Sequence, residues 1–297
     1  MKKRIASFGS VRVGDGLPVR ILAAVNVSPE SFYGGSVATS AREVARRVAE
    51  AVDSGADAVD LGAMSTAPYL KNEVSAEVER DRIASALRAI AGSGVTVSVD
   101  TTRASVAESA LRNGATVVND VSGLGGDPRM AAVVRDHGAS LLAMAHSSRA
   151  SRARPLARVR ADLKATLRAA VGAGIGEERV VLDPGIGFYR EEGAGAAYSP
   201  QRLMPWDRWD ATVVAGLEGL RTLGRPLCVG LSRKSFLGRI LGLPDPDDRL
   251  PASLAAAAIA VMNGAAMVRT HDVVETLQAV RVAEAVRTRG RRACRPS

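Results

Sequence analysis

Eight short apolar runs recur along the chain, and a longer amphipathic segment follows each of them. The runs are nearly continuous rather than alternating, as is typical of parallel strands covered on both faces. They span residues 19–27, 57–63, 95–101, 116–122, 140–146, 179–186, 226–232 and 265–271. Eight such units within 297 residues predict an α/β fold, a closed (β/α)8 or TIM barrel.

A doubly wound nucleotide-binding sheet is the main alternative for an α/β chain, and the first strand argues against it. Ser28-Pro29-Glu30-Ser31-Phe32 follows that strand, and no glycine-rich dinucleotide fingerprint is present there. No Pro/Ser-rich linker divides the chain. We therefore expect a single domain over 1–297, with a basic flexible tail at 288–297.

Composition narrows the class of partner. The chain carries 40 Lys and Arg against 31 Asp and Glu, a net charge of +9, and the arginines gather at 149–160 and 287–295. No aromatic side chains are interleaved there to stack on bases, so a solvated surface is favoured and no nucleic-acid partner is expected.

The remaining composition points to the cytoplasm. Two cysteines, Cys228 and Cys294, make neither a disulfide framework nor a metal-ligand spacing. The N-terminal residues lack the apolar centre of a signal peptide, and the most apolar long stretch, 254–262, is too short to cross a bilayer. We expect a cytoplasmic protein with no membrane partner.

Polar side chains lie at or near the end of every predicted strand. In a barrel these ends converge on one mouth, where substrates bind. Unpartnered buried carboxylates cost roughly several kcal/mol, so such a ring needs a ligand, water or basic partners. Asp60 or Asp120, taken singly, could instead cap a helix or hold a loop. The set comprises Asn26, Asp60, Asp100, Thr101, Asn119, Asp120, His146, Asp183, Ser232, Arg233, Lys234, Arg269 and His271.

Seven motifs at these strand ends resemble those of the dihydropteroate synthase family, from about residue 21 to residue 276. They are, in order, Asn26–Phe32, Asp60-Leu61-Gly62 with Ser65-Thr66, Ser98–Thr101, Val118–Gly123, Leu182–Phe188, Gly230–Phe236 and Arg269–Val273. The resemblance implies a transferase of folate biosynthesis. It would join 6-hydroxymethyl-7,8-dihydropterin pyrophosphate to p-aminobenzoate, or to a related arylamine, and release pyrophosphate.

The resemblance also implies roles for individual residues. A carboxylate can accept paired N–H bonds from the aminopyrimidinone edge of a pterin, and a lysine can donate to its ring carbonyl or N5. The expected pterin-binding residues are Asp100, Asn119, Met144, Asp183 and Lys234, with Met144 as an apolar wall. Arg269, His271 and Asn26 are expected at the pyrophosphate, with Asn26 also a ligand of Mg²⁺. Arylamine contacts are expected from Ser28, Pro29, Phe32, Thr66 and Ser235.

The reaction expected is a substitution at the pterin methylene. The leaving pyrophosphate gains charge, so cationic donors such as Arg269 and His271 would stabilise the transition state. An arylamine is already nucleophilic, and the chain shows no nucleophile–His–carboxylate arrangement. The catalytic set expected is Asp100, Lys234, Arg269 and His271. By the same resemblance the chain is expected to form a homodimer.

The chain departs from the family pattern mainly on the arylamine side. Ala67 stands where bacterial members carry an arginine, and Tyr189-Arg190 follows Phe188 where Gly-Lys is usual. Met144-Ala145-His146 replaces Met-His-Met, and Tyr33-Gly34-Gly35 alters the first loop. A larger arylamine, such as a ribosylated aminobenzene phosphate, therefore stays open.

Two other readings compete with the synthase. A pterin-binding methyltransferase would pass a methyl group to a corrinoid and would not need donors for pyrophosphate, which Lys234, Arg269 and His271 supply here. A non-catalytic pterin-binding protein, or a basic nucleic-acid-binding protein, is the alternative outside enzymes.

Overall fold

The structure, a computed structural model, describes residues 3–27, 40–63, 74–191 and 199–293, with the side chains of residues 289–293 excepted. Eight parallel strands form one sheet in the order β11-β12-β3-β4-β5-β6-β7-β8. The strands are β3 (Arg20–Asn26), β4 (Ala58–Gly62), β5 (Thr96–Asp100), β6 (Val117–Asp120), β7 (Ser140–Met144), β8 (Val180–Asp183), β11 (Cys228–Gly230) and β12 (Met267–Thr270). Each predicted apolar run contains one of them.

The two ends of this sheet meet and close it. Leu182 of β8 forms a parallel bridge with Leu227, and its N–H donates to the carbonyl oxygen of Pro226 at 3.0 Å. Leu227 directly precedes β11. The predicted (β/α)8 barrel and single domain are therefore confirmed.

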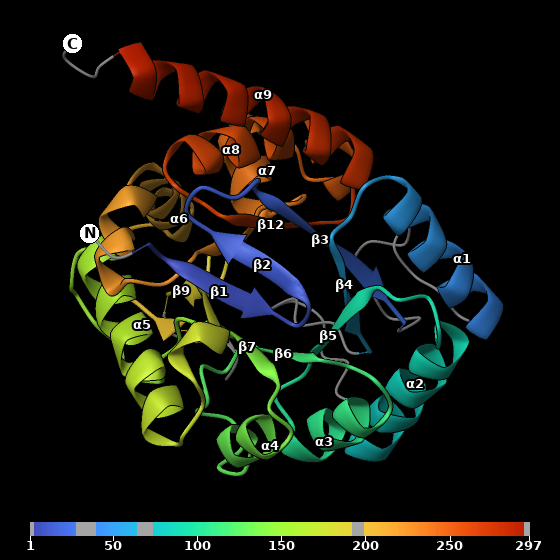
Figure 1. Ribbon diagram of the computed structural model, residues 1–297. Coiled ribbons are helices and arrows are strands. Elements are labelled where there is room, and N and C mark those ends of the chain that lie inside the picture. The colour runs from blue at the N-terminus through green and yellow to red at the C-terminus, as the bar shows by residue number, and fades with distance from the viewer. Residues whose placement is uncertain (1–2, 28–39, 64–73, 192–198, 294–297) are drawn as a thin grey trace.

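Helices form the outer layer around the strands (Figure 1). Ser40 caps α1, because its Oγ accepts the N–H of Glu43 at 3.2 Å. Alanine, valine and leucine side chains make up most of the core between the helices and the strands, in keeping with the 3% aromatic content. The helices are α1 (Ala41–Asp53), α2 (Ala76–Ala89), α3 (Ala104–Arg112), α4 (Met130–Asp136), α5 (Pro155–Gly172), α6 (Trp206–Ala215), α7 (Ser235–Leu241), α8 (Leu250–Met262) and α9 (Val273–Ala293).

A hairpin that the sequence did not lead us to expect closes the N-terminal end of the barrel. Its strands β1 (Ile5–Phe8) and β2 (Val11–Gly14) are antiparallel and lie across that end (Figure 1). Phe8 is fully buried among apolar side chains of the barrel interior, a burial that stabilises the fold by about 1.5–3 kcal/mol. Ser140 ties the hairpin to β7, since its Oγ donates to the carbonyl oxygen of Ser7 at 2.8 Å.

Two further features lie outside the predicted pattern. A short parallel pair, β9 (Tyr189–Arg190) with β10 (Ser199–Pro200), follows β8. Helix α9 continues to Ala293 and so takes in the first part of the segment expected as a tail, while 294–297 lie outside the described residues. Among the described residues, no helix has the length and apolar character needed to span a membrane.

Candidate active site

Side chains that face the inside of the barrel change from apolar to polar along the strands. At the hairpin end, the inner layer consists of Leu22, Ala58, Val117, Leu142, Val181, Cys228 and Met267. Side chains alternate along a strand, so the residue two positions later faces the same interior. Those residues are Ala24, Asp60, Asn119, Met144, Asp183, Gly230 and Arg269. The polar mouth therefore rests on an apolar floor.

Asp60 joins three of these strands into one hydrogen-bonded network. Its Oδ2 accepts from Asn119 Nδ2 at 3.0 Å and from Arg269 Nε at 2.6 Å. The same guanidinium donates from Nη2 to Asp100 Oδ2 at 3.1 Å. Asp100, Asn119 and Arg269 were predicted to converge, and they do so around a carboxylate that is fully buried.

Several acceptors in this network face no donor of their own. Asp60 Oδ1 and Asp100 Oδ1 are buried, and each has no hydrogen-bond partner among the described residues; the same holds for Ser98 Oγ. Buried polar atoms are nearly always hydrogen-bonded in folded proteins, so unpaired ones at a barrel mouth indicate a ligand or water. Unpaired carboxylate oxygens favour a ligand rich in N–H groups.

The protonation of the network follows from its burial. Burial, reinforced by the neighbouring charge of Asp60, raises the pKa of Asp100 to about 7. Burial lowers the pKa of Arg269, but Asp60 and Asp100 outweigh this and raise it overall, so the guanidinium keeps its charge. One permanent cation thus stands between two carboxylates, one of which can titrate near neutral pH.

Asp183 and Lys234 supply the other side of the mouth. Asp183 Oδ1 accepts the N–H of Gly185 at 2.7 Å, and Lys234 Nζ lies 4.8 Å from the centroid of the Phe188 ring. Burial lowers the pKa of Lys234 to about 8, while the charge of Asp183 opposes that shift. Gly187 has φ +92°, and a Cβ there would lie 3.1 Å from Lys234 Nζ, so glycine leaves room for the lysine.

These two groups lie at the same end of the barrel as the Asp60 network. The charges of Lys234, Arg269 and Asp60 all act on Asp183, whose pKa burial raises. Met144, the predicted apolar wall, pairs with Asp183 across β7 and β8 and is 1% exposed. The predicted pterin-binding residues thus converge on one mouth.

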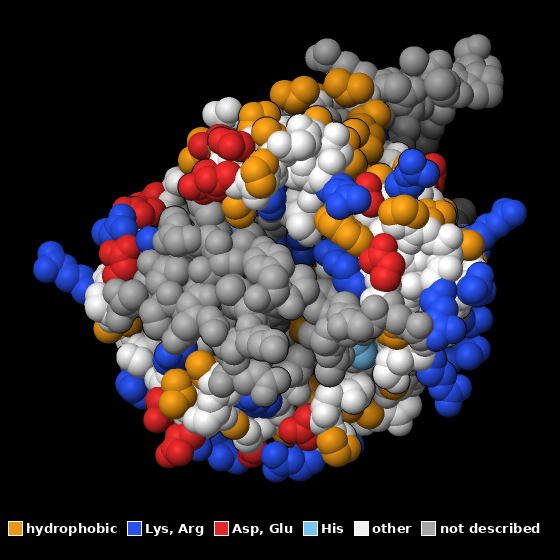
Figure 2. Space-filling model, turned by 180° about the vertical axis from the view of Figure 1, so that it is seen from behind, with side chains coloured by type: hydrophobic (Ala, Val, Ile, Leu, Met, Phe, Trp, Pro, Cys, Tyr) orange, Lys and Arg blue, Asp and Glu red, His pale blue; other side chains and the backbone are white. Residues whose placement is uncertain are grey.

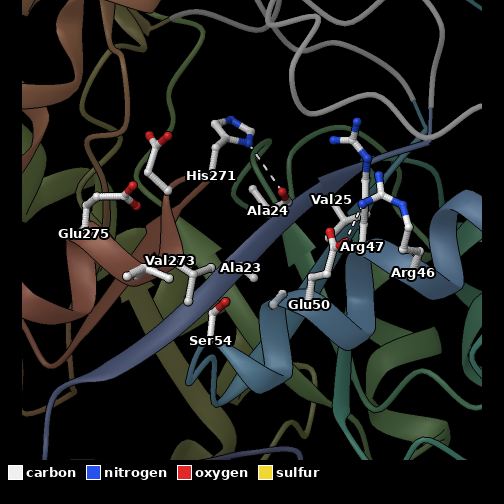
Figure 3. A pocket seen from close by; sticks show the side chains of 13 residues that line it. Ala23, Ala24, Val25, Arg46, Arg47, Glu50, Ser54, His271, Val273 and Glu275 are labelled. Atoms are coloured by element: carbon white, nitrogen blue, oxygen red, sulfur yellow. Dashed lines mark hydrogen bonds and ion pairs between the residues drawn. The ribbon is translucent and has the colours of Figure 1, made fainter.

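His271 lies at the edge of the mouth, beside a cavity. Its Nδ1 lies 3.3 Å from the carbonyl oxygen of Ala24 (Figure 3). Burial, and then the charge of Arg269, lower the pKa of His271 to about 4, so it is a neutral imidazole at pH 7. It was expected as a cationic donor; Arg269 alone of the pair is the cation. The cavity, about 360 Å³, separates α9 from Arg46, Arg47 and Glu50 of α1 (Figure 3).

Three polar strand ends hold loops rather than line the mouth. Asp120 is fully buried; its Oδ1 accepts from the backbone and hydroxyl of Ser122, and its Oδ2 accepts the N–H of Leu124 at 2.8 Å. Thr101 donates to Glu79 at 2.6 Å, and Arg233 pairs with Asp272. Asp120 therefore holds a loop, which was the alternative considered for it from the sequence. Asp60 does not, because it joins the network at the mouth.

The predicted arylamine contacts are only partly described. Ser235, the first residue of α7, accepts a hydrogen bond from Arg190 Nη2 at 3.3 Å. The others, Ser28, Pro29, Phe32 and Thr66, lie outside the described residues, as does Ala67.

The donors near Arg269 and His271, the residues predicted to bind pyrophosphate, fit a metal ion that takes most of its ligands from water and a bound phosphate. Asn26 and Asp100 lie on either side of Gly62 in the sheet register, and glycine places no side chain between them. The described part of the chain has no group of three or more His, Cys, Asp or Glu that could hold a metal ion. This set suits Mg²⁺ that keeps waters and phosphate oxygens as ligands.

Comparison with known proteins decides the family. Residues 22–271 match the family model described as "Pterin binding enzyme". The chain belongs to this pterin-binding enzyme family. It is 37% identical to a dihydropteroate synthase of Mycobacterium leprae over 279 residues, covering 89% of this chain and 92% of that one. It is 32% identical to a Bacillus subtilis dihydropteroate synthase, covering 91% and 89%.

Solved structures of the pterin-binding enzyme family agree. A Yersinia pestis dihydropteroate synthase in a sulfonamide complex is 28% identical, with a TM-score of 0.83 over 96% of this chain and 99% of that one. A Thermus thermophilus dihydropteroate synthase, solved in complex with 6HMPPP, is 34% identical with a TM-score of 0.77 over 95% and 100%. The predicted family, fold and enzyme class, a transferase of the dihydropteroate synthase kind, are confirmed.

The departures after Phe188 are accommodated by packing. Tyr189 is fully buried, stacks on Trp209 with ring centroids 5.0 Å apart, and donates to Asp162 at 2.8 Å. Arg190 lies 4.4 Å from the centroid of the Trp206 ring. This pterin-binding enzyme therefore carries a bulkier loop support than the Gly-Lys pattern provides.

Asp210 on α6 was missed by the sequence reasoning. It is fully buried, accepts the N–H of Gly187 at 2.9 Å and lies 3.5 Å from Arg190 Nη1. Burial raises the pKa of Asp210 to about 6. It supports the loop on which Phe188 lies, and because it sits in a helix rather than at a strand end, no strand-end pattern would have found it.

Proposed function

We propose that this chain condenses 6-hydroxymethyl-7,8-dihydropterin pyrophosphate with an arylamine, p-aminobenzoate in the first place, to give dihydropteroate and pyrophosphate. The observation that carries the proposal is the set of unpaired carboxylate oxygens of Asp60 and Asp100, opposite Asp183 and Lys234. A pterin offers N–H donors along one edge and a carbonyl with ring nitrogens beside them. The barrel mouth offers carboxylate acceptors and a lysine donor, the groups that such an edge needs.

The pterin would bind deepest in the mouth. Asp183 keeps an oxygen beyond the Gly185 contact for the ring N–H groups, and Asn119, oriented by Asp60, offers its amide oxygen. Lys234 would donate to the ring carbonyl or N5, and Met144 would cover one side. Since Lys234 is held beside Phe188, its ammonium needs little rearrangement when the ring arrives.

The reaction breaks the bond between the pterin methylene carbon and the pyrophosphate oxygen, which leaves with the electron pair. The arylamine nitrogen forms the new C–N bond and loses a proton to solvent. Arg269, fixed by Asp60 and Asp100, would stabilise the charge that grows on the leaving oxygen. His271 would donate to the same group from Nε2 as an imidazolium, because its Nδ1 donates to the carbonyl oxygen of Ala24, and the charge of a bound pyrophosphate favours that form. No general base is required, so positioning and electrostatics carry the rate.

Mg²⁺, when bound, would neutralise charge on the pyrophosphate oxygens, with Asn26 as its protein ligand. Substrate oxygens would supply most of the ligands, so the protein alone would hold Mg²⁺ weakly and EDTA would remove it. Chelation is therefore expected to lower turnover by about tenfold or more, and added Mg²⁺ to restore it. The measurement is pyrophosphate release with and without the chelator. Turnover that EDTA leaves unchanged would remove the metal from the proposal.

The deciding experiment is a coupled pyrophosphate-release assay over a panel of arylamines. Release that requires both the pyrophosphorylated pterin and an arylamine, with pteroate detected as product, supports the synthase. Methyl transfer from a methylated pterin to a corrinoid, without pyrophosphate release, would instead favour the methyltransferase. Pterin binding with no turnover would favour a non-catalytic binder. A preference for a ribosylated aminobenzene over p-aminobenzoate would change the amine and leave the pterin half intact.

We expect a bell-shaped pH profile for kcat/KM. Below about pH 7, protonation of Asp100 removes a carboxylate acceptor, so activity rises as pH increases through that pKa. Above about pH 8, Lys234 loses its proton and its charge, and activity falls. Asp100→Asn should abolish the acid limb and keep the alkaline one. A flat profile from pH 6 to 9 would contradict both roles.

We further propose a homodimer through helices α7 and α8. Four large apolar side chains there are 44–56% exposed: Ile240, Leu241, Ile259 and Met262. Figure 2 shows hydrophobic side chains gathered along the upper edge of the molecule. Such patches are typical of subunit interfaces, and a second copy supplies the matching surface.

Light scattering after size exclusion would test the dimer. The wild-type chain should run as a dimer and the double variant Ile259→Asp with Met262→Asp as a monomer, because two buried carboxylates per subunit would oppose the contact. Val171→Asp, at an exposed position on α5, is the control and should stay dimeric. A monomeric wild type would refute the dimer.

A cytoplasmic location stays a prediction.

A further inference from the structure

Arg233 adopts a backbone conformation that its residue type disfavours. Its φ is +53°, in the left-handed region that glycine occupies readily and a long side chain rarely does. Such a conformation persists when the surrounding contacts over-determine it. Arg233 lies directly before Lys234 and directly after Ser232, at the mouth end of β11.

Contacts to every polar part of Arg233 hold it in place. Its Nε and Nη2 donate to the two carboxylate oxygens of Asp272 at 3.0 and 2.7 Å, a bidentate pair that is 7% exposed on the arginine side. Its Nη1 donates to the carbonyl oxygen of Asp247 at 2.9 Å. Its backbone N–H donates to Ser253 Oγ at 2.8 Å, and its carbonyl accepts from Arg249.

These contacts connect two neighbouring strand ends that serve different parts of the substrate. Lys234 follows Arg233 and belongs to the pterin side, whereas His271 precedes Asp272 and belongs to the pyrophosphate side. Ser232 makes a second link, because its Oγ accepts the N–H of His271 at 3.4 Å and donates to Asp272 at 3.3 Å. The bidentate geometry fixes both the separation and the orientation of the two segments.

We propose that Arg233 and Asp272 are a positioning pair that sets the place of Lys234 relative to His271, so that one ligand can reach both. The inference rests on the proposed function. Neither side chain needs to contact substrate. A pair of this kind should matter little for a ligand that fills only one side, and strongly for a ligand that spans both.

Three dissociation constants test this: those of 6-hydroxymethylpterin, of inorganic pyrophosphate with Mg²⁺, and of the pyrophosphorylated pterin, each without arylamine. In Arg233→Lys, which keeps the charge but cannot form two parallel N–H bonds, the first two should stay within about threefold of wild type. The third should weaken by about tenfold or more, with a similar fall in kcat. Asp272→Asn should behave in the same way.

A matched control lies at the other end of the barrel. Arg4 and Asp15, which flank the hairpin strands, form a partly buried bidentate pair, and Arg4→Lys should leave all three constants unchanged. If Arg233→Lys does not fold, the constants of Asp272→Asn decide. Equal weakening of all three ligands in the Arg233 and Asp272 variants, or no weakening at all, overturns the pair as a positioning device. A wild-type chain that releases no pyrophosphate overturns the proposed function and this inference together.

Discussion

Replacement of Arg269 by alanine is expected to damage both stability and turnover. The change leaves Asp60 and Asp100 buried side by side without their cation. Removing one partner of a buried ion pair typically destabilises a protein by about 3–5 kcal/mol. The loss of the donor aimed at the leaving group should lower kcat/KM by about 100- to 1000-fold.

Urea unfolding and the pyrophosphate-release assay measure the two effects of Arg269→Ala. Arg269→Lys should recover much of the stability, because it restores a charge, and less of the turnover. Arg112→Ala serves as the control: its pair with Glu108 is exposed on α3, so its loss should change stability by about 0.5 kcal/mol or less. An Arg269→Ala variant as stable as Arg112→Ala would rule out the buried network described around Asp60.

Asp183→Asn is expected to weaken pterin binding by about 100-fold or more. An amide in this place can still accept the N–H of Gly185, but it turns an NH₂ donor toward the N–H groups of the ring. A site built around hydrogen bonds loses affinity steeply when a donor of the protein faces a donor of the ligand. Calorimetric titration with 6-hydroxymethylpterin measures the loss directly and does not depend on turnover.

Asp120→Asn is the comparison for Asp183→Asn, because both carboxylates end a strand. The oxygens of Asp120 bind Ser122 and Leu124, so this variant should lower the unfolding temperature and leave pterin affinity within about twofold. Equal affinity losses in the two variants would mean that Asp183 acts through folding rather than through contact with the ring.

The contrast between Asn119 and Asp120 shows what the sequence could and could not predict. The apolar runs predicted all eight barrel strands because parallel strands covered on both faces need such runs. Side chains alternate along a strand, so only one of two adjacent polar residues faces the barrel interior. Val117 faces the interior, and Asn119, two residues later, therefore does so too, whereas Asp120 does not. Applied to Asp60, two residues after Ala58, the same alternation would have placed it in the site from the sequence.

The hairpin was missed for a different reason. Its strands are four residues long and mix Ser7 and Arg12 with apolar neighbours, so no run stands out. The Gly9-Ser10 turn between them was the available signal, since Gly-Ser is typical of two-residue hairpin loops. Arg190, Asp210 and the Arg233–Asp272 pair depend on contacts between distant segments, which no local pattern reports.

The hairpin also determines from which end of the barrel a ligand can enter the enzyme. Phe8 is buried across the N-terminal end, so a flat ring bound against Asp60 and Asn119, as proposed, would enter from the opposite end, where Lys234 and His271 lie. If both reactants enter from this end, the one that binds deeper must bind first, and it leaves joined to the second as the condensation product. An inhibitor bound at the entrance would therefore trap a heterocycle that is already bound below it. Its potency would increase with the concentration of that heterocycle.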